Sequence, residues 1–120
     1  MARGLILARS IRITGGIHRG RRFRSGPAAG LRPTTDRVRS AIFSILGEQT
    51  VHGAQVLDLY AGTGAMGMEA LSRGAAWADF VETNTRLARR MVENLDELSM
   101  TPASQVHTMR VEMALRALTK

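Results

Sequence analysis

The stretch Gln55-Val-Leu-Asp-Leu-Tyr-Ala-Gly-Thr-Gly-Ala-Met-Gly67 decides the fold of this chain. It begins with a short apolar run at 56–59, which is typical of a buried parallel strand. Three glycines, Gly62, Gly64 and Gly67, then lead into a segment with helical periodicity. Glycine at such a turn lets backbone amides approach a ligand at the start of a helix. The stretch therefore predicts a strand, a glycine turn and a helix that form half of a nucleotide-type site.

Two classes of ligand fit this glycine spacing. Residues 62–67 match G-x-G-x-x-G, and Glu82 lies twenty residues after Gly62, as in the dinucleotide fingerprint. Asp58, four residues before Gly62, favours a different ligand. A carboxylate at the mouth of the turn repels a diphosphate where screening is poor, but it attracts a sulfonium and an ammonium group. We therefore predict an S-adenosylmethionine site, with an NAD-dependent oxidoreductase as an alternative.

The second half of the chain continues an α/β pattern. A second strand is expected at 78–81, a third at 105–111, and helices after Asn84 and over 112–118. The second strand ends at Glu82, and a carboxylate at that place lies on the rim where ligands bind in parallel sheets. Glu82 is interpreted as the acceptor for ribose hydroxyls, although an acid that stabilises the start of a helix fits the same position.

An amphipathic helix is expected ahead of the central strand. Pro33 disfavours helical geometry at Arg32, and Thr34 or Thr35 can cap a helix that ends near Gly47. Whether these threonines only cap the helix or also contact a ligand stays open on this pattern alone. The predicted buried stripe consists of Val38, Ala41, Ile42, Ile45 and Leu46.

The positive charge of the chain is concentrated at its beginning. The net charge is +7, and residues 1–39 hold ten arginines against the single acid Asp36. Within this arm the sequence predicts a small hairpin over 11–24, studded with arginine, that must lean on the domain or on a partner. Arginine clusters of this kind favour phosphate and base contacts, so a non-catalytic RNA-binding protein is a second alternative.

Composition narrows the remaining possibilities. The chain has no cysteine, which excludes disulfides and cysteine metal sites and fits a cytoplasmic location. The apolar run at 5–8 is too short for a membrane span, so no membrane partner is expected. No metal is expected, and His18, His52 and His107 are not expected to be catalytic, since the sequence offers them no evident partner.

Three segments together resemble the bacterial 16S ribosomal RNA (guanine-N(2)) methyltransferase family. They are Arg32-Pro-Thr-Thr-Asp-Arg-Val-Arg39, Val56-Leu-Asp-Leu-Tyr-Ala-Gly-Thr-Gly64 and Glu69-Ala-Leu-Ser-Arg-Gly-Ala75. The resemblance runs from about Ser10 onward and is expected to cover the N-terminal two-thirds of such an enzyme. It implies a Rossmann-like class I S-adenosylmethionine methyltransferase fold that methylates the exocyclic amine of a guanine during small-subunit maturation.

The resemblance also implies roles for particular residues. The substrate is ribosomal RNA or a small-subunit assembly intermediate, faced by the basic arm at 1–31, while 32–120 bind the cofactor. The residues implied for the cofactor are Thr34, Thr35, Asp58, Tyr60, Ala61, Gly62, Thr63, Gly64 and Glu82. Those implied for RNA are Arg12, Arg19, Arg21, Arg22, Arg24, Arg32, Arg37 and Arg39.

The chain departs from this family in one important respect. Family members carry an Asp/Asn-Pro-Pro-Tyr/Phe motif after the fourth strand, and this sequence has no Pro-Pro pair. No catalytic residue is therefore assigned, and the fold is expected to be incomplete, with an N-terminal hairpin and only the first three parallel strands. The acid expected beside the adenine is displaced by one position near Glu112, which is left unassigned.

That incompleteness has a physical consequence. In the family the fourth strand lies beside the first, so the strand at 56–59 is expected to be an uncovered apolar edge, a hazard for aggregation. The 120-residue chain alone is therefore expected to self-associate or dissolve poorly and to transfer no methyl group.

Overall fold

A computed structural model describes residues 10–25 and 35–118, and all structural statements concern these two ranges. Residues 1–9, Arg32, Thr34 and the expected domain boundary at 31/32 lie outside them. The elements along the chain are β1 (Ser10–Arg12), β2 (Arg22–Arg24), α2 (Asp36–Leu46), α3 (Glu48–Val51), β3 (Gln55–Asp58), α4 (Ala65–Ser72), β4 (Trp77–Glu82), α5 (Thr85–Glu97), a 3-10 turn (Thr101–Ala103), β5 (Ser104–Thr108) and α6 (Val111–Leu118).

The centre of the fold is a parallel sheet with the strand order β3-β4-β5. Val56 pairs with Ala78 and Asp79 pairs with Gln105, so the carboxyl ends of the strands meet at one rim. Each crossover passes through a helix, α4 and then α5, as parallel strands require. The three predicted strands and the crossover helices are thereby confirmed, although the third strand ends at Thr108 and α6 already begins at Val111.

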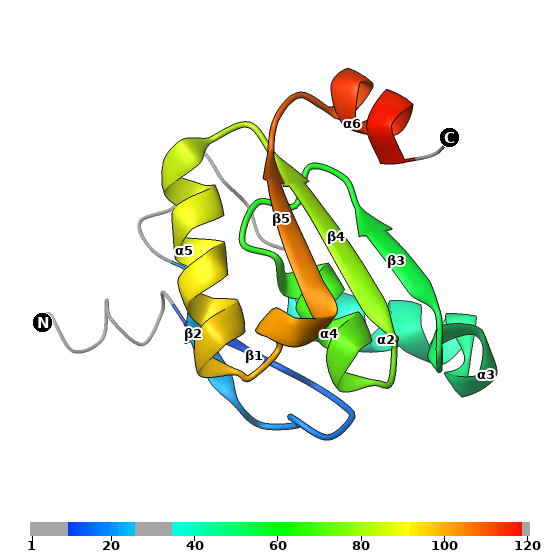
Figure 1. Cartoon of the computed structure of the whole chain (residues 1–120). Helices are drawn as coiled ribbons and strands as arrows, with labels where there is room; N and C mark the ends of the chain where they lie inside the picture. Colours follow the sequence, from blue (N-terminus) through cyan, green and yellow to red (C-terminus); the bar gives the residue numbers. More distant parts are fainter. Residues whose placement is uncertain (1–9, 26–34, 119–120) are drawn as a thin grey trace, which may run out of the picture.

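The two faces of the sheet are covered differently. Phe80 and Val81 are consecutive in β4 and both fully buried, so they point to opposite faces. Phe80 belongs to the large core with α4 and α5, whereas Val81 packs with Val111 and Ala114 of α6. Figure 1 shows α6 beyond the carboxyl end of β5 and the β1–β2 hairpin near the opposite end of the sheet.

Helix α4 is buried almost all round, and two of its polar side chains hold the hairpin. Glu69 is fully buried and accepts hydrogen bonds from the backbone N–H groups of Thr14 (3.0 Å) and Gly15 (2.9 Å). The Ser72 hydroxyl donates to the carbonyl of Gly15 at 2.6 Å. The hairpin therefore leans on the domain, which is one of the two supports that the sequence analysis allowed.

The buried face of α2 differs from the prediction. Thr35 caps the helix and Gly47 ends it, as expected, but the buried residues are Arg39 and Phe43. Ile45 is 84% exposed and Val38 is 46% exposed, so the predicted apolar stripe largely faces outward. The helix is turned because Arg39 reaches the buried Glu69 carboxylate at 3.6 Å. A buried carboxylate requires such a partner, and this outweighs the burial of one aliphatic stripe.

Strand β3 lies at the end of the described sheet, as predicted, because it pairs only with β4 there. Self-association through this edge stays a prediction. Within the described ranges, no helix is both long enough and apolar enough to cross a membrane.

Candidate functional site

The glycine turn lies at the carboxyl end of β3, where three residues adopt left-handed backbone geometry. Their φ angles are 56° at Tyr60, 57° at Gly62 and 83° at Gly64. Glycine accepts this geometry without strain, whereas Tyr60 is a non-glycine exception, which is common at ligand sites. The turn is closed by hydrogen bonds from Ala61 N to the Val81 carbonyl (2.9 Å) and from Gly64 N to the Ala61 carbonyl (2.8 Å).

Asp58 ends β3 directly beneath this turn. Its Oδ2 accepts a hydrogen bond from the backbone N–H of Gly67 at 3.0 Å. Burial, opposed by that hydrogen bond and reinforced by the charge of Glu82, raises the pKa of Asp58 to about 6. Burial makes this carboxylate costly to ionise. A positive charge nearby would stabilise its ionised form, so the position favours a cationic ligand.

Glu82 ties the turn to the next helix. Its Oε1 accepts from Gly62 N at 2.8 Å and its Oε2 accepts from Asn84 N at 2.9 Å. Each carboxylate oxygen keeps a further lone pair, so the group can still accept from the two hydroxyls of a ribose. The structure thus brings the predicted acids Asp58 and Glu82 to the same rim, on neighbouring strands.

Two hollows flank these acids. One, of about 200 Å³, is lined by Tyr60, Glu82, Met109, Arg110 and neighbouring residues, including Glu112. The other, of about 410 Å³, is lined by Asp58, Leu59 and Gly67 together with apolar side chains of α2, α3 and β3. Leu59 and Tyr60, from the two linings, are consecutive. Asp58 therefore lines one hollow and Glu82 the other, on the two sides of the turn that follows β3.

The other predicted cofactor residues have more local roles. Thr63 is buried, and its hydroxyl oxygen accepts from Ala65 N at 3.3 Å at the start of α4. The hydroxyl of Thr35 accepts from Val38 N, also at 3.3 Å, as a helix cap. Glu112, which has no assigned role, is exposed, and the hydrogen bond from Arg110 lowers its pKa.

The arginines expected to face RNA divide into two groups. Arg12, Arg19, Arg21, Arg22, Arg24 and Arg37 are exposed. Arg39 is only 1% exposed; it donates to the Arg12 carbonyl at 2.6 Å and to Asp36 at 2.7 Å. The expectation that Arg39 faces RNA is therefore wrong, because this guanidinium fixes α2 against β1 and α4.

Sequence reasoning missed two charged clusters. Glu69 belongs to one of the family-like segments, and in the structure it also connects the hairpin, α2 and α4. The sequence does contain an indication of this role, because Glu69 is a charged residue within the otherwise small or apolar run 65–72. A carboxylate in such a helix is buried only when it has a partner. His107, judged to have no partner, contacts the carboxylate of Asp79 at 2.7 Å, on a neighbouring strand.

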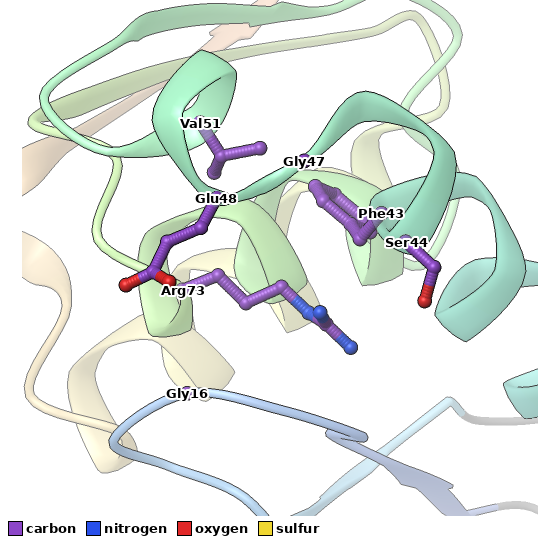
Figure 2. Close-up of a pocket in the computed structure, with 7 residues that line it drawn as sticks. All are labelled: Gly16, Phe43, Ser44, Gly47, Glu48, Val51 and Arg73. Carbon is purple, nitrogen blue, oxygen red and sulfur yellow. The ribbon is translucent and has the colours of Figure 1, made fainter.

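A third hollow, of about 300 Å³, lies between the hairpin and the corner from α2 to α3. Figure 2 shows Arg73 extending across it, with its guanidinium towards Phe43 and Ser44 and away from Glu48. The guanidinium lies 5.2 Å from the centre of the Phe43 ring and donates to Glu69 at 2.7 Å. Within the described ranges, no three His, Cys, Asp or Glu side chains are grouped as metal ligands.

Gly67→Ala is expected to destabilise the protein by about 1–3 kcal/mol, although alanine favours helices. A Cβ there would lie 2.3 Å from Cε1 of the buried Phe80 ring and 3.1 Å from Oδ2 of Asp58. Urea unfolding measures the loss. In the double variant with Phe80→Leu, the loss should be smaller than the sum of the two single losses. A Gly67→Ala variant as stable as the parent would show that this close approach is not required.

The comparisons with known proteins agree on one family. Residues 11–120 match the family described as "Conserved hypothetical protein 95". Over 98 residues the chain is 45% identical to "Ribosomal RNA small subunit methyltransferase D" of Escherichia coli (strain K12), covering 82% of this chain and 49% of that protein. Over 110 residues it is 36% identical to "Putative rRNA methyltransferase YlbH" of Bacillus subtilis (strain 168), covering 92% and 59%.

Solved structures show the same likeness. "Putative methyltransferase yhhF from Escherichia coli" superposes with a TM-score of 0.79 at 37% identity, covering 88% of this chain and 56% of that one. A hypothetical protein of Thermus thermophilus superposes with a TM-score of 0.76 at 33% identity, covering 89% and 60%. The chain spans about half the length of the curated relatives it matches, somewhat less than the two-thirds expected.

Proposed function

Because the chain belongs to the rRNA methyltransferase family described as "Conserved hypothetical protein 95", we propose that it binds S-adenosylmethionine and serves the methylation of a guanine exocyclic amine in 16S ribosomal RNA. The donor would supply the electrophilic methyl group. The observation that carries the proposal is the half-buried Asp58 carboxylate, held by Gly67 N beneath the glycine turn.

The residues of this chain would hold and orient the donor. The negative charge of Asp58 would attract the cationic amino-acid end of S-adenosylmethionine, whereas it would repel a diphosphate. Glu82 would accept from the ribose hydroxyls while it keeps the backbone of Gly62 in place. This arrangement supports a methyl donor over a dinucleotide, although the glycine spacing fits both.

Catalysis of this type depends on alignment more than on acid–base chemistry from these residues. A fixed donor and a fixed acceptor amine reach one another without the entropy cost of a free encounter. The element that would hold the target amine is assigned to no residue of this chain. Exposed arginines of the hairpin, such as Arg19 and Arg24, supply the positive surface that an RNA phosphate backbone requires.

Calorimetry with S-adenosylhomocysteine and with NAD tests the ligand. We expect heat with the former only, and Glu82→Gln should weaken that binding by about tenfold or more, since hydrogen bonds to a charged group are the stronger ones. The matched control is Glu93→Gln, because Glu93 is exposed on α5 and lines neither of the two hollows beside the acids. Binding of NAD, or equal affinity in the Glu82→Gln variant, would contradict the assignment.

The RNA target needs its own measurement. The full gene product is incubated with tritiated methyl donor and either protein-free 16S ribosomal RNA or an under-methylated small-subunit particle. Nucleoside analysis should give N(2)-methylguanosine. A label on another nucleoside would refute the guanine assignment while leaving donor binding intact.

A further inference from the structure

The tip of the hairpin, residues 15–20, is fastened to the end of α4. Backbone N–H groups of Ile17 and His18 donate to the carbonyl oxygen and the hydroxyl of Ser72, at 2.9 and 3.0 Å. Gly16 has a φ of 83°, and a Cβ there would lie 1.9 Å from the Ser72 carbonyl oxygen. The tip is therefore not a free loop, and its orientation is fixed by the same helix that follows the glycine turn.

Ile17 projects from this fixed tip into solvent. Its side chain is 87% exposed, the largest fraction among the exposed large apolar residues of the described ranges. Its backbone is held at its own N–H, and Gly20 N adds a hydrogen bond back to the Ile13 carbonyl at 2.8 Å. When a partner covers an aliphatic side chain that is held rigidly in water, apolar surface is buried and the free energy of the complex is lowered.

The surroundings of Ile17 indicate which partner that is. Residues 10–25 carry five arginines and no acid, and both Arg19 in the tip and Arg21 just after it are exposed. In the described ranges, no hydrogen bond or ion pair is found for the side chain of Arg19. Arginine also occurs at protein contacts, but a run of arginines with no acid among them suits the phosphates of a nucleic acid.

We propose that Ile17 is an apolar wedge that packs against exposed bases of the RNA while the neighbouring arginines hold its phosphates. This inference rests on the proposed function, since it needs an RNA substrate, and it adds a contact that the arginines alone do not provide. Apolar side chains such as isoleucine are used in this way between base steps.

The place of the tip determines what the wedge can affect. The tip contacts the last turn of α4, whereas the glycine turn lies just before the first turn of that helix. The eight residues of α4 span about 12 Å, so the tip and the glycine turn are separated by about that distance along the helix. Figure 1 shows the hairpin and the loop after β3 at opposite ends of the sheet. Ile17 therefore contributes to RNA affinity and register, and not to the alignment of the methyl group with its acceptor.

The test is a filter-binding titration of the full gene product against protein-free 16S ribosomal RNA, at salt between about 50 and 200 mM. Ile17→Ser should weaken binding about tenfold without changing the salt slope, and Ile17→Leu should stay within about twofold of the parent. Arg19→Gln should weaken binding and reduce the slope by about one. The matched control is Ile45→Ser, because Ile45 is equally apolar and 84% exposed on α2.

The contrary outcomes separate the wedge from the function on which it rests. If Ile17→Ser binds like the parent while Arg19→Gln binds less well, the wedge is refuted and an RNA-binding enzyme remains. If Ile17→Ser alters only the sedimentation of the protein, the residue serves a protein contact and the wedge is again refuted. A parent protein without salt-dependent RNA binding refutes the RNA substrate itself, whatever calorimetry shows for the methyl donor.

Discussion

Glu69→Ala is expected to lower the free energy of unfolding by about 3–5 kcal/mol, the usual cost of removing one partner from a buried ion pair. The carboxylate is fully buried and has four hydrogen-bond donors: Thr14 N (3.0 Å), the Thr14 hydroxyl (2.8 Å), Gly15 N (2.9 Å) and Arg73 Nε (2.7 Å). A small domain has only about 5–15 kcal/mol to lose. The variant should therefore be largely unfolded at a temperature where the parent is folded.

The loss has a second component, because Arg39 depends on the same carboxylate. Its guanidinium is 1% exposed and lies 3.6 Å from Glu69, so removal of the acid takes away one of the negative charges that balance this buried cation. Glu69→Gln keeps the size and one acceptor oxygen but removes the charge. We expect the free energy of unfolding of Glu69→Gln to lie between that of the parent and that of Glu69→Ala.

Two measurements check this prediction. Urea unfolding gives the free energy, and hydrogen exchange at Thr14 and Gly15 reports whether the hairpin detaches before the domain unfolds. The control is Glu93→Ala, since Glu93 is exposed on α5 and should change stability by no more than about 0.5 kcal/mol. Equal stability of Glu69→Ala and Glu93→Ala would show that the hairpin needs no such anchor.

The effect depends on pH with a definite sign. Burial alone would raise the pKa of Glu69, but the hydrogen bonds from Thr14 and Arg73 outweigh it and lower the pKa. A lowered pKa means that the contribution is fully present above the unfolded value of 4.5 and is lost as the pH falls through the folded value. The difference between parent and Glu69→Ala should therefore shrink in acid.

The sequence predicted the parts of this site that follow local rules. The strand expected at 56–59 and found at 55–58, the glycine turn and the start of the helix after Asn84 depend on neighbouring residues, so local patterns were enough to predict them. The acids Asp58 and Glu82 end neighbouring parallel strands, so their meeting at one rim followed from the topology.

The parts that were missed depend on contacts between distant segments. The apolar periodicity of α2 predicted the burial of Val38 and Ile45, but a carboxylate on α4 draws Arg39 inward and turns the helix. The pair of His107 and Asp79 lies across two strands separated by 28 residues, and no local pattern joins them. Ion pairs between distant segments can be predicted from the sequence only when the register of the sheet is known.

The site and the scaffold use carboxylates in opposite ways. Glu69 is satisfied by donors from the protein, so its ionisation stabilises the fold. Asp58 has one backbone donor, Gly67 N, and is costly to ionise. The protein itself provides little stabilisation for the charged form of Asp58. A cationic ligand would supply the missing positive charge, which suits this position to a ligand site.

Asp58→Asn is accordingly expected to stabilise the protein and to impair its function. The pKa of Asp58 rises from 3.8 to about 6 on folding, so its ionisation opposes folding. The penalty is absent below the unfolded pKa, grows between 3.8 and about 6 and is complete above that pH. Asparagine keeps an oxygen for Gly67 N without the charge, and the variant should gain up to about 3 kcal/mol at pH 8 and nothing at about pH 4.

The methyl donor should respond in the opposite direction. Loss of the charge opposite its cationic end should weaken binding of S-adenosylmethionine by about 10- to 100-fold at about pH 8. Binding to the parent should weaken as the pH falls below about 6, where Asp58 takes up a proton, whereas binding to the variant should not change there. Thermal unfolding and calorimetry at the two pH values give both quantities, with Asp96→Asn on the exposed face of α5 as the control. A variant that binds the donor as tightly as the parent would remove the electrostatic basis for choosing a sulfonium ligand over a diphosphate.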